Sequence, residues 1–178
     1  GTAGQVDYTY APEYISKFPK NLADWAFLTD YNCDGKEDLL TYSSAMIPAP
    51  AGITAYKNIS TPGNLQFAID YPLIYASTPS GPINLYVSSV DKPALVDEDG
   101  DGDMDAFSIS VGGGTVTKYK NLAMENFGRC DTLVFEWQQN CWGNFIITFT
   151  NAALLGVACR PTTFNNSGND TIIVDAPA

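Results

Sequence analysis

The chain has 178 residues, a formal net charge of −11 and a sequence pI of about 4.1. This acidic balance provides no basic patch that could neutralise phosphates, which argues against nucleic acid as a partner, and no apolar run approaches the length of a membrane span. The chain also has no histidine, which removes the commonest general base and zinc ligand, so we expect a protein that is not an enzyme.

An alternating strand candidate at 6–10 precedes the first informative segment, which spans residues 22–42 and predicts strand, acidic loop, strand. Oxygen-bearing side chains occupy positions 1, 3, 5 and 9 of the loop, and a glycine at position 6 permits a sharp turn. These residues are Asp30, Asn32, Asp34 and Asp38, with Gly35 at the turn. Lys36 stands at position 7, where only its backbone carbonyl could bind a cation.

Short apolar or alternating runs follow the first acidic loop. After a proline-rich connection at 48–52, they predict strands at 53–58, 65–69, 73–75 and 83–88. No helical period interrupts this series, so the segment favours an all-β fold.

The second acidic loop repeats the first with more negative charge. It joins a short apolar segment at 93–96 to a predicted strand at 106–110. Its odd positions all carry carboxylates, with Gly102 at position 6, and they are Asp97, Asp99, Asp101, Asp103 and Asp105. By analogy with Lys36, Asp103 is expected to offer its backbone carbonyl and to leave its carboxylate free.

Alternate spacing lets a turning loop direct several oxygens at one point, which suits a hard cation, Ca²⁺ before Mg²⁺. The alternative is a solvated acidic turn without an ion. An EF-hand is excluded because position 12 is Thr41 or Ser108 rather than glutamate, and because strands flank each loop. We expect two Ca²⁺ sites, the second stronger, since it offers four carboxylates against three and an amide.

The two loops belong to a longer repeat. The second loop begins 67 residues after the first, and the triplet Tyr56-Lys57-Asn58 recurs as Tyr119-Lys120-Asn121, 63 residues on. A third unit, from about residue 122, includes strand candidates at 145–149 and 171–174 but no acidic loop. A period of about 65 residues with several strands matches a β-propeller blade.

Four cysteines allow three disulfide pairings. Cys130 and Cys141 flank a strand-like run at 132–137, and closing that short loop would contribute roughly 3 kcal/mol on the chain-entropy model. Cys33 with Cys159 then follows by elimination; other pairings and free thiols stay open. Disulfides, and the millimolar Ca²⁺ that modest sites need, favour an extracellular location at a cell surface.

The runs DYNCDGKEDLL and DEDGDGDMDAF, each followed by a YKN strand, resemble FG-GAP/VCBS repeats, the calcium-binding blades of integrin-alpha-type propellers. The resemblance implies that loop positions 1, 3, 5 and 9 bind Ca²⁺ through side chains and position 7 through its backbone. The segment CDTLVFEWQQNCWG resembles secreted surface proteins of Bacteroidota, often exported by the type IX system. Family propellers have about seven blades, whereas this chain has material for two and a fraction.

These features predict an all-β chain of propeller blades that forms an incomplete propeller or part of a larger one, with self-assembly of several copies as the alternative. Residues 1–21 would end a preceding blade or link to it, 22–88 and 89–150 would be calcium-binding blades, and 151–178 a partial blade. The expected function is adhesion or scaffolding, with other blades, domains or copies of the chain as partners. The alternative is a carbohydrate-binding or accessory module of a secreted polysaccharide-degrading enzyme, which would need exposed aromatics such as Trp25, Trp137 or Trp142. An enzymatic interpretation would need a carboxylate pair in a cleft away from both loops.

Overall fold

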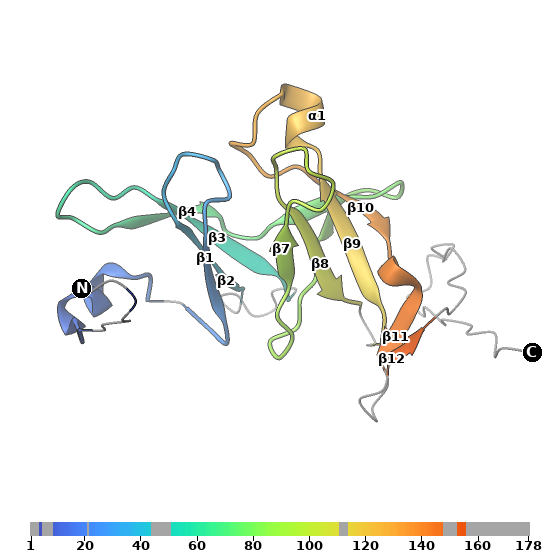
Figure 1. The fold of residues 1–178 in the computed structure, drawn as a ribbon, viewed down its shortest axis with the longest axis horizontal. Coiled ribbons are helices and arrows are strands. Elements are labelled where there is room, and N and C mark those ends of the chain that lie inside the picture. The colour runs from blue at the N-terminus through green and yellow to red at the C-terminus, as the bar shows by residue number, and fades with distance from the viewer. Residues whose placement is uncertain are drawn as a thin grey trace, which may run out of the picture.

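A computed structural model describes residues 4, 9–20, 22–43, 51–110 and 114–147, together with the backbone of 153–155. The described part is almost entirely β-structure (Figure 1). The strands are β1 (Ala26–Thr29), β2 (Asp38–Tyr42), β3 (Ile53–Asn58), β4 (Phe67–Tyr71), β5 (Tyr75–Ser77), β6 (Ile83–Asn84), β7 (Ala94–Val96), β8 (Asp105–Ile109), β9 (Val116–Asn121), β10 (Phe135–Gln139), β11 (Phe145–Ile147) and β12 (Ala153–Leu155). One short α-helix, α1 (Ala123–Phe127), and two 3-10 helices, Pro12–Lys17 and Trp142–Asn144, complete it.

The strands form two main sheets. The first is the antiparallel meander β1-β2-β3-β4. The second has the order β6-β5-β10-β9-β8-β7 and contains a second antiparallel meander, β7-β8-β9-β10, to which β5 adds in parallel. The strands β11 and β12 form a separate pair. The all-β prediction is therefore confirmed for the described residues.

The two meanders have the same strand register. Leu39 pairs with Tyr56 in the first, and Ala106 pairs with Tyr119 in the second, so the offsets of 67 and 63 residues recur in the ladders. The pairing of the third and fourth strands also matches and is interrupted at the same place. In the first meander the register shifts between Ala55 and Tyr56, and in the second it shifts between their counterparts, Lys118 and Tyr119.

The hydrophobic core lies between the two meanders. Because strand residues alternate between faces, each meander has two faces, which we name by one residue of the second strand. The Leu40 face of the first meander includes Ala55, and it packs against the Ala106 face of the second, which includes Tyr119. The residues Ile74, Ala76, Leu85 and Val87, from the chain that joins the meanders, fill the space between them.

Each meander has a second face that is not part of this contact: the Leu39 face of the first and the Phe107 face of the second. The Phe107 face of the second meander occupies the position that the Leu40 face occupies in the first. It carries a hollow of about 300 Å³ lined by Ala94, Val96, Phe107, Ile109, Val116 and Trp142, among others. The Leu39 face of the first meander exposes Leu28 and Ile69, which lie in one row across the sheet.

Several predicted elements differ in extent. The strand predicted at 83–88 ends at Asn84, since Leu85 and Val87 are buried in the core instead of continuing a ladder. The helix α1 was not predicted. The candidate at 6–10 falls largely outside the described residues, and the candidate at 171–174 falls entirely outside them. No helix in the described part is long and apolar enough to cross a membrane.

The predicted pairing of Cys130 with Cys141 is wrong. Cys130 forms a disulfide with Cys33, with 5.9 Å between their Cα atoms, and Cys141 is engaged in another disulfide. The physical reason is β10, whose five residues span about 17 Å and hold the two ends of this segment apart. The predicted pairing of Cys33 with Cys159 is also wrong, because Cys33 is bonded to Cys130; Cys159 itself lies outside the described residues.

Candidate metal centre

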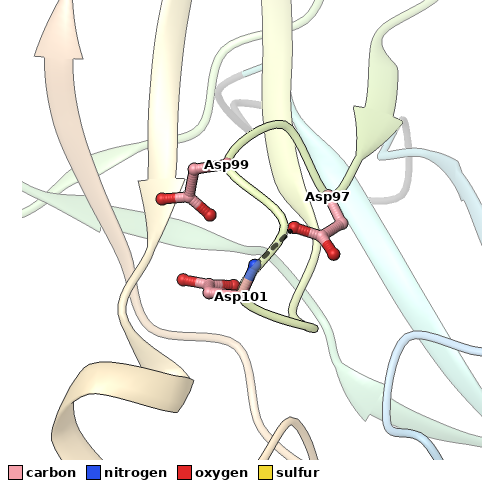
Figure 2. Close-up of side chains that lie close together, drawn as sticks. All are labelled: Asp97, Asp99 and Asp101. Atoms are coloured by element: carbon pink, nitrogen blue, oxygen red, sulfur yellow. Dashed lines mark hydrogen bonds between the residues drawn. The ribbon is translucent and has the colours of Figure 1, made fainter.

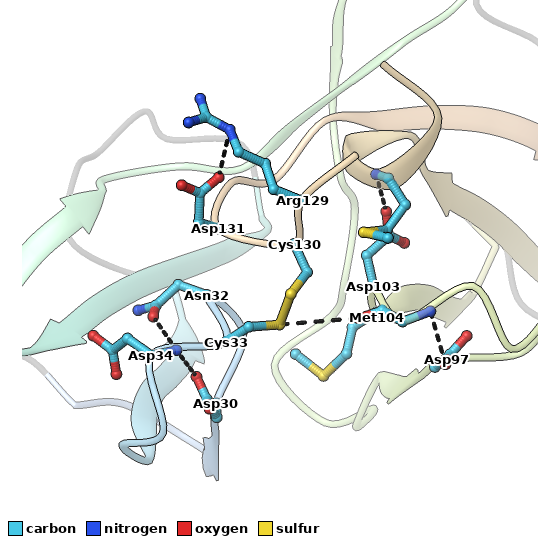
Figure 3. Close-up of a disulfide and its surroundings, with 12 residues drawn as sticks. Asp30, Asn32, Cys33, Asp34, Asp97, Asp103, Met104, Arg129, Cys130 and Asp131 are labelled. Atoms are coloured by element: carbon cyan, nitrogen blue, oxygen red, sulfur yellow. Dashed lines mark hydrogen bonds and ion pairs between the residues drawn. A yellow bond between two sulfur atoms is a disulfide. The ribbon is translucent and has the colours of Figure 1, made fainter. Parts of the chain in front are cut away.

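Both acidic loops lie at the same end of the molecule, beside each other and beside α1 (Figures 1 and 3). The sulfur of Cys33, in the first loop, is 3.9 Å from the carbonyl oxygen of Gly102, in the second. Thr29, just before the first loop, donates a hydrogen bond to the sulfur of Met104 at 3.3 Å. The disulfide to Cys130 then ties the first loop to the connection between β9 and β10.

The loops share their internal hydrogen bonds. The carboxylate at position 1 accepts the backbone N–H groups of positions 5 and 6: for Asp30 these come from Asp34 at 3.0 Å and Gly35 at 2.8 Å. For Asp97 the corresponding groups, at positions 5 and 6, donate at 3.1 Å each. Gly35 and Gly102 have φ values of +81° and +101°, which a side chain at position 6 would strain.

The carboxylates at position 9 are buried. Asp38 and Asp105 are 0% and 1% exposed, and they accept the backbone N–H of Asn58 at 2.7 Å and of Asn121 at 2.9 Å. Burial raises the pKa of Asp38 to about 6, and it also raises the pKa of Asp105. Burying a carboxylate in this way is unfavourable unless an opposite charge or enough donors compensate it.

The loops differ in how the second oxygen of that carboxylate is satisfied. In the first loop, the amide of Asn32 donates to Asp38 Oδ2 at 2.6 Å. In the second loop, position 3 is Asp99, which cannot donate, and Asp105 Oδ2 has no hydrogen-bond partner. The ammonium of Lys118 lies 3.8 Å from that oxygen.

Carboxylates gather closely in the second loop. Oxygen atoms of Asp97, Asp99 and Asp101 lie within 4.8 Å of one another (Figure 2). A second group of the same closeness consists of Asp101, Asp103 and Glu125. In the described part of the chain no other three acidic, cysteine or histidine side chains come this close.

The donors of the second loop fit a hard divalent cation. They are all carboxylate oxygens, the ligand type that Ca²⁺ prefers. Asp101 Oδ2, Asp103 Oδ1 and Asp105 Oδ2 are shielded from solvent and accept no hydrogen bond. The ammonium groups of Lys120 and Lys118 lie 3.6 Å from Asp101 Oδ2 and 3.8 Å from Asp105 Oδ2. Desolvated carboxylate oxygens without hydrogen bonds are costly, and a bound cation would reduce that cost further.

The side chain at position 7 contacts the connection between the third and fourth strands of its own meander in both loops. The ammonium of Lys36 donates to the backbone carbonyl of Ser60 at 3.3 Å, while Asp103 Oδ2 accepts the backbone N–H of Met124, in α1, at 2.8 Å. The expectation that the Asp103 carboxylate is free is therefore corrected: it is buried and bonded to the helix, and burial raises its pKa to about 6.

Sequence reasoning missed the lysine of each YKN triplet and Glu125. Lys57 lies 3.6 Å from Asp34, and Lys120 lies 3.6 Å from Asp101 and also pairs with Asp99 and Glu125. The hydrogen bonds from Lys120 lower the pKa of Asp99 and of Glu125. The recurrence of YKN after each loop could have indicated the lysines, but nothing in the sequence pointed to Glu125.

Comparison of the chain with protein-family models, with curated proteins and with solved structures found no match. The likeness to FG-GAP/VCBS repeats therefore depends on the two loops and the YKN triplets themselves.

Proposed function

We propose that this chain is a non-catalytic, calcium-stabilised segment of a β-propeller of the FG-GAP/VCBS type, serving adhesion or scaffolding outside the cell. The single observation that supports it best is the pair of acidic loops with the same hydrogen bonds, set between strands of the same register. The oxygens that would bind Ca²⁺ are side chains at positions 1, 3, 5 and 9 and the carbonyl at position 7.

Calcium would act structurally. Each loop connects neighbouring antiparallel strands, β1 to β2 and β7 to β8, and in the second loop the carboxylates repel one another at close range. A divalent cation would convert that repulsion into attraction and hold the ends of both strands together. Binding to the folded state alone stabilises it by about 2.7 kcal/mol when Ca²⁺ is at 100 times its dissociation constant.

The packing of the meanders supports a scaffold. The Leu40 face of one unit covers the Ala106 face of the next, so equivalent units stack in one direction. The Phe107 face carries an apolar hollow where another Leu39-type face would fit, and the Leu39 face exposes Leu28 and Ile69. The natural partners are therefore further blades, in the same polypeptide or in a second copy.

A disulfide supports an oxidising location, where Ca²⁺ is also abundant. The proposed site of action is thus extracellular, at a cell surface. Secretion through the bacterial type IX system belongs to the same proposal and depends on the resemblance of the 130–143 segment alone.

Thermal unfolding in Ca²⁺ and in excess chelator tests the proposal. We expect chelation to lower the Tm by several degrees, about what 2–3 kcal/mol gives a chain of this size. Asp97→Ala should lower the Tm in Ca²⁺ and reduce the response to chelator. Asp131→Asn, which removes an exposed carboxylate paired with Arg129, is the matched control and should behave as the parent. Identical melting with and without chelator would refute a structural role for Ca²⁺.

Carbohydrate binding remains the second candidate, with one specific location. Trp25 is buried in the core and so presents no ring to a glycan, and Trp137 is partly buried against the core. Trp142 packs edge-on to Phe107 at 4.8 Å and lines the apolar hollow. Binding on a glycan array that Trp142→Ala abolishes would favour this function over stacking.

A further inference from the structure

The second loop has more negative charge than one cation can compensate. The loop and Glu125 provide seven carboxylates: Asp97, Glu98, Asp99, Asp101, Asp103, Asp105 and Glu125. Two ammonium groups, from Lys118 and Lys120, face them. The first loop has four carboxylates, with Lys57 beside Asp34 and Lys36 bonded to the carbonyl of Ser60, so by formal charge one Ca²⁺ would balance that loop but would leave the second strongly negative.

The excess charge is concentrated on the side of the loop that faces α1. Carboxylate oxygens of Asp101, Asp103 and Glu125 lie within 4.8 Å of one another. Two of these residues come from the loop and one from the helix, which is held in place by the hydrogen bond from Met124 N–H to Asp103. In the first meander, the equivalent connection between β3 and β4 has no helix, and position 7 of the loop that contacts it is Lys36.

A second observation at the same place points to a bound ion. Asp103 is only 3% exposed, and while its Oδ2 accepts the Met124 N–H, its Oδ1 is shielded from solvent without any hydrogen-bond partner. Asp101 Oδ2 is shielded and unbonded as well. The ammonium of Lys120 reaches Asp101, Asp99 and Glu125, so one positive charge is shared among three carboxylates.

We propose that the second loop holds a further Ca²⁺ position, formed by the carboxylates of Asp101, Asp103 and Glu125. Asp101 bridges it to the position formed by Asp97 and Asp99. Lys120 occupies the space between the carboxylates in the metal-free protein, and its ammonium moves toward solvent when the cation binds. Through Glu125 the cation also joins α1 to the loop. This inference rests on the proposed function, with which it shares Asp101 and, through a different atom, Asp103.

Counting bound Ca²⁺ tests the proposal. Native mass spectrometry of the disulfide-intact full chain, with calorimetry in parallel, should give three Ca²⁺ per chain at saturation, one in the first loop and two in the second. Glu125→Gln, at an exposed position, should reduce the count to two and leave the remaining affinities unchanged. Asp131→Asn, the matched control, should retain three. Terbium luminescence titrations should show the same loss of one position in Glu125→Gln.

Lys120→Gln provides a second measurement that does not depend on removing a ligand. Without the competing ammonium, the weakest Ca²⁺ step should tighten, whereas a purely structural ion pair between Lys120 and Glu125 predicts no such change. Two Ca²⁺ in the parent, or an unchanged count in Glu125→Gln, would overturn this inference and leave the proposed function intact. No Ca²⁺ binding at all would overturn both.

Discussion

The first and second acidic loops have the same backbone hydrogen bonds but different means of balancing their charge. In the first, the Asn32 amide satisfies Asp38, and Lys36 and Lys57 supply positive charge. Its second residue, Tyr31, is buried in the core and donates to Asp70, an interaction that together with burial raises the pKa of the tyrosine. In the second loop, carboxylates replace Tyr31, Asn32 and Lys36, whereas Lys57 has a lysine, Lys120, as its counterpart. Similar loop backbones therefore carry one loop whose buried carboxylate is satisfied by a donor of its own and one loop whose carboxylates exceed the donors around them.

Removing the disulfide should have the largest effect, because it frees the first loop from the connection between β9 and β10. The double variant Cys33→Ser/Cys130→Ser opens a covalent loop of 97 residues, and the chain-entropy model predicts a loss of roughly 4–5 kcal/mol. Urea unfolding of the variant and the parent in Ca²⁺ would measure it. A loss below about 1 kcal/mol would mean that the contacts between the loops hold them together without the covalent bond.

The next largest effect should come from the equivalent substitutions Asp34→Ala and Asp101→Ala. Each removes position 5, but Asp101 belongs to both carboxylate clusters while Asp34 belongs to neither. In Ca²⁺ we expect Asp101→Ala to lose about 3 kcal/mol of stability and Asp34→Ala about 1 kcal/mol. Equal losses, measured by thermal melting, would show that the two loops depend on Ca²⁺ to the same degree.

Asn32→Asp should make the first loop resemble the second. It replaces the donor to the buried Asp38 with a carboxylate, so the metal-free protein should lose about 1–3 kcal/mol. The Ca²⁺ affinity of the same loop should increase because its ligands gain a negative charge. Calorimetry and melting in chelator would measure the two changes separately. An unchanged stability in chelator would mean that the Asn32 hydrogen bond contributes nothing.

The smallest effect should be that of pH, below about 1.4 kcal/mol per pH unit for each group. The pKa values of Asp38 and Asp103 are raised to about 6, above their unfolded values, so the native state binds protons that the unfolded chain does not. The metal-free protein should therefore become more stable as pH falls from 7 toward 4. Protons compete with Ca²⁺ for the same oxygens, so stabilisation by Ca²⁺ should shrink over that range. Melting curves with and without chelator would show both trends.

The sequence predicted the local structure well where it depends on residues a few positions apart, such as alternating apolar side chains and turn glycines. The strand at 53–58 and the strand–loop–strand arrangement around both loops follow from alternating apolar residues and from Gly35 and Gly102. The candidate ligands were predicted from spacing alone, and the structure shows that three of them, Asp97, Asp99 and Asp101, lie close together. The Cys33–Cys130 pairing was not predicted, because the two residues are 97 positions apart and meet only once the meanders pack.

The helix α1 and Glu125 show a second limit of the sequence. The helix has five residues, and its N-cap, Leu122, makes no side-chain cap hydrogen bond, so no local start signal exists. It is held instead by Asp103, a residue 21 positions away. The cluster to which Glu125 contributes could therefore be recognised only after the tertiary structure was known.

The Cys33–Cys130 bond also determines how this chain would respond to mechanical tension. A force applied to its two ends cannot lengthen the segment between those cysteines, because the covalent bond carries the load directly from residue 33 to residue 130. Only the flanking parts of the polypeptide could be drawn out, while β2, β3 and most of the second sheet stay inside a closed ring. Under such a force the whole second loop and positions 4 to 9 of the first would stay within that inextensible part, whereas Asp30 and Asn32 lie just outside it.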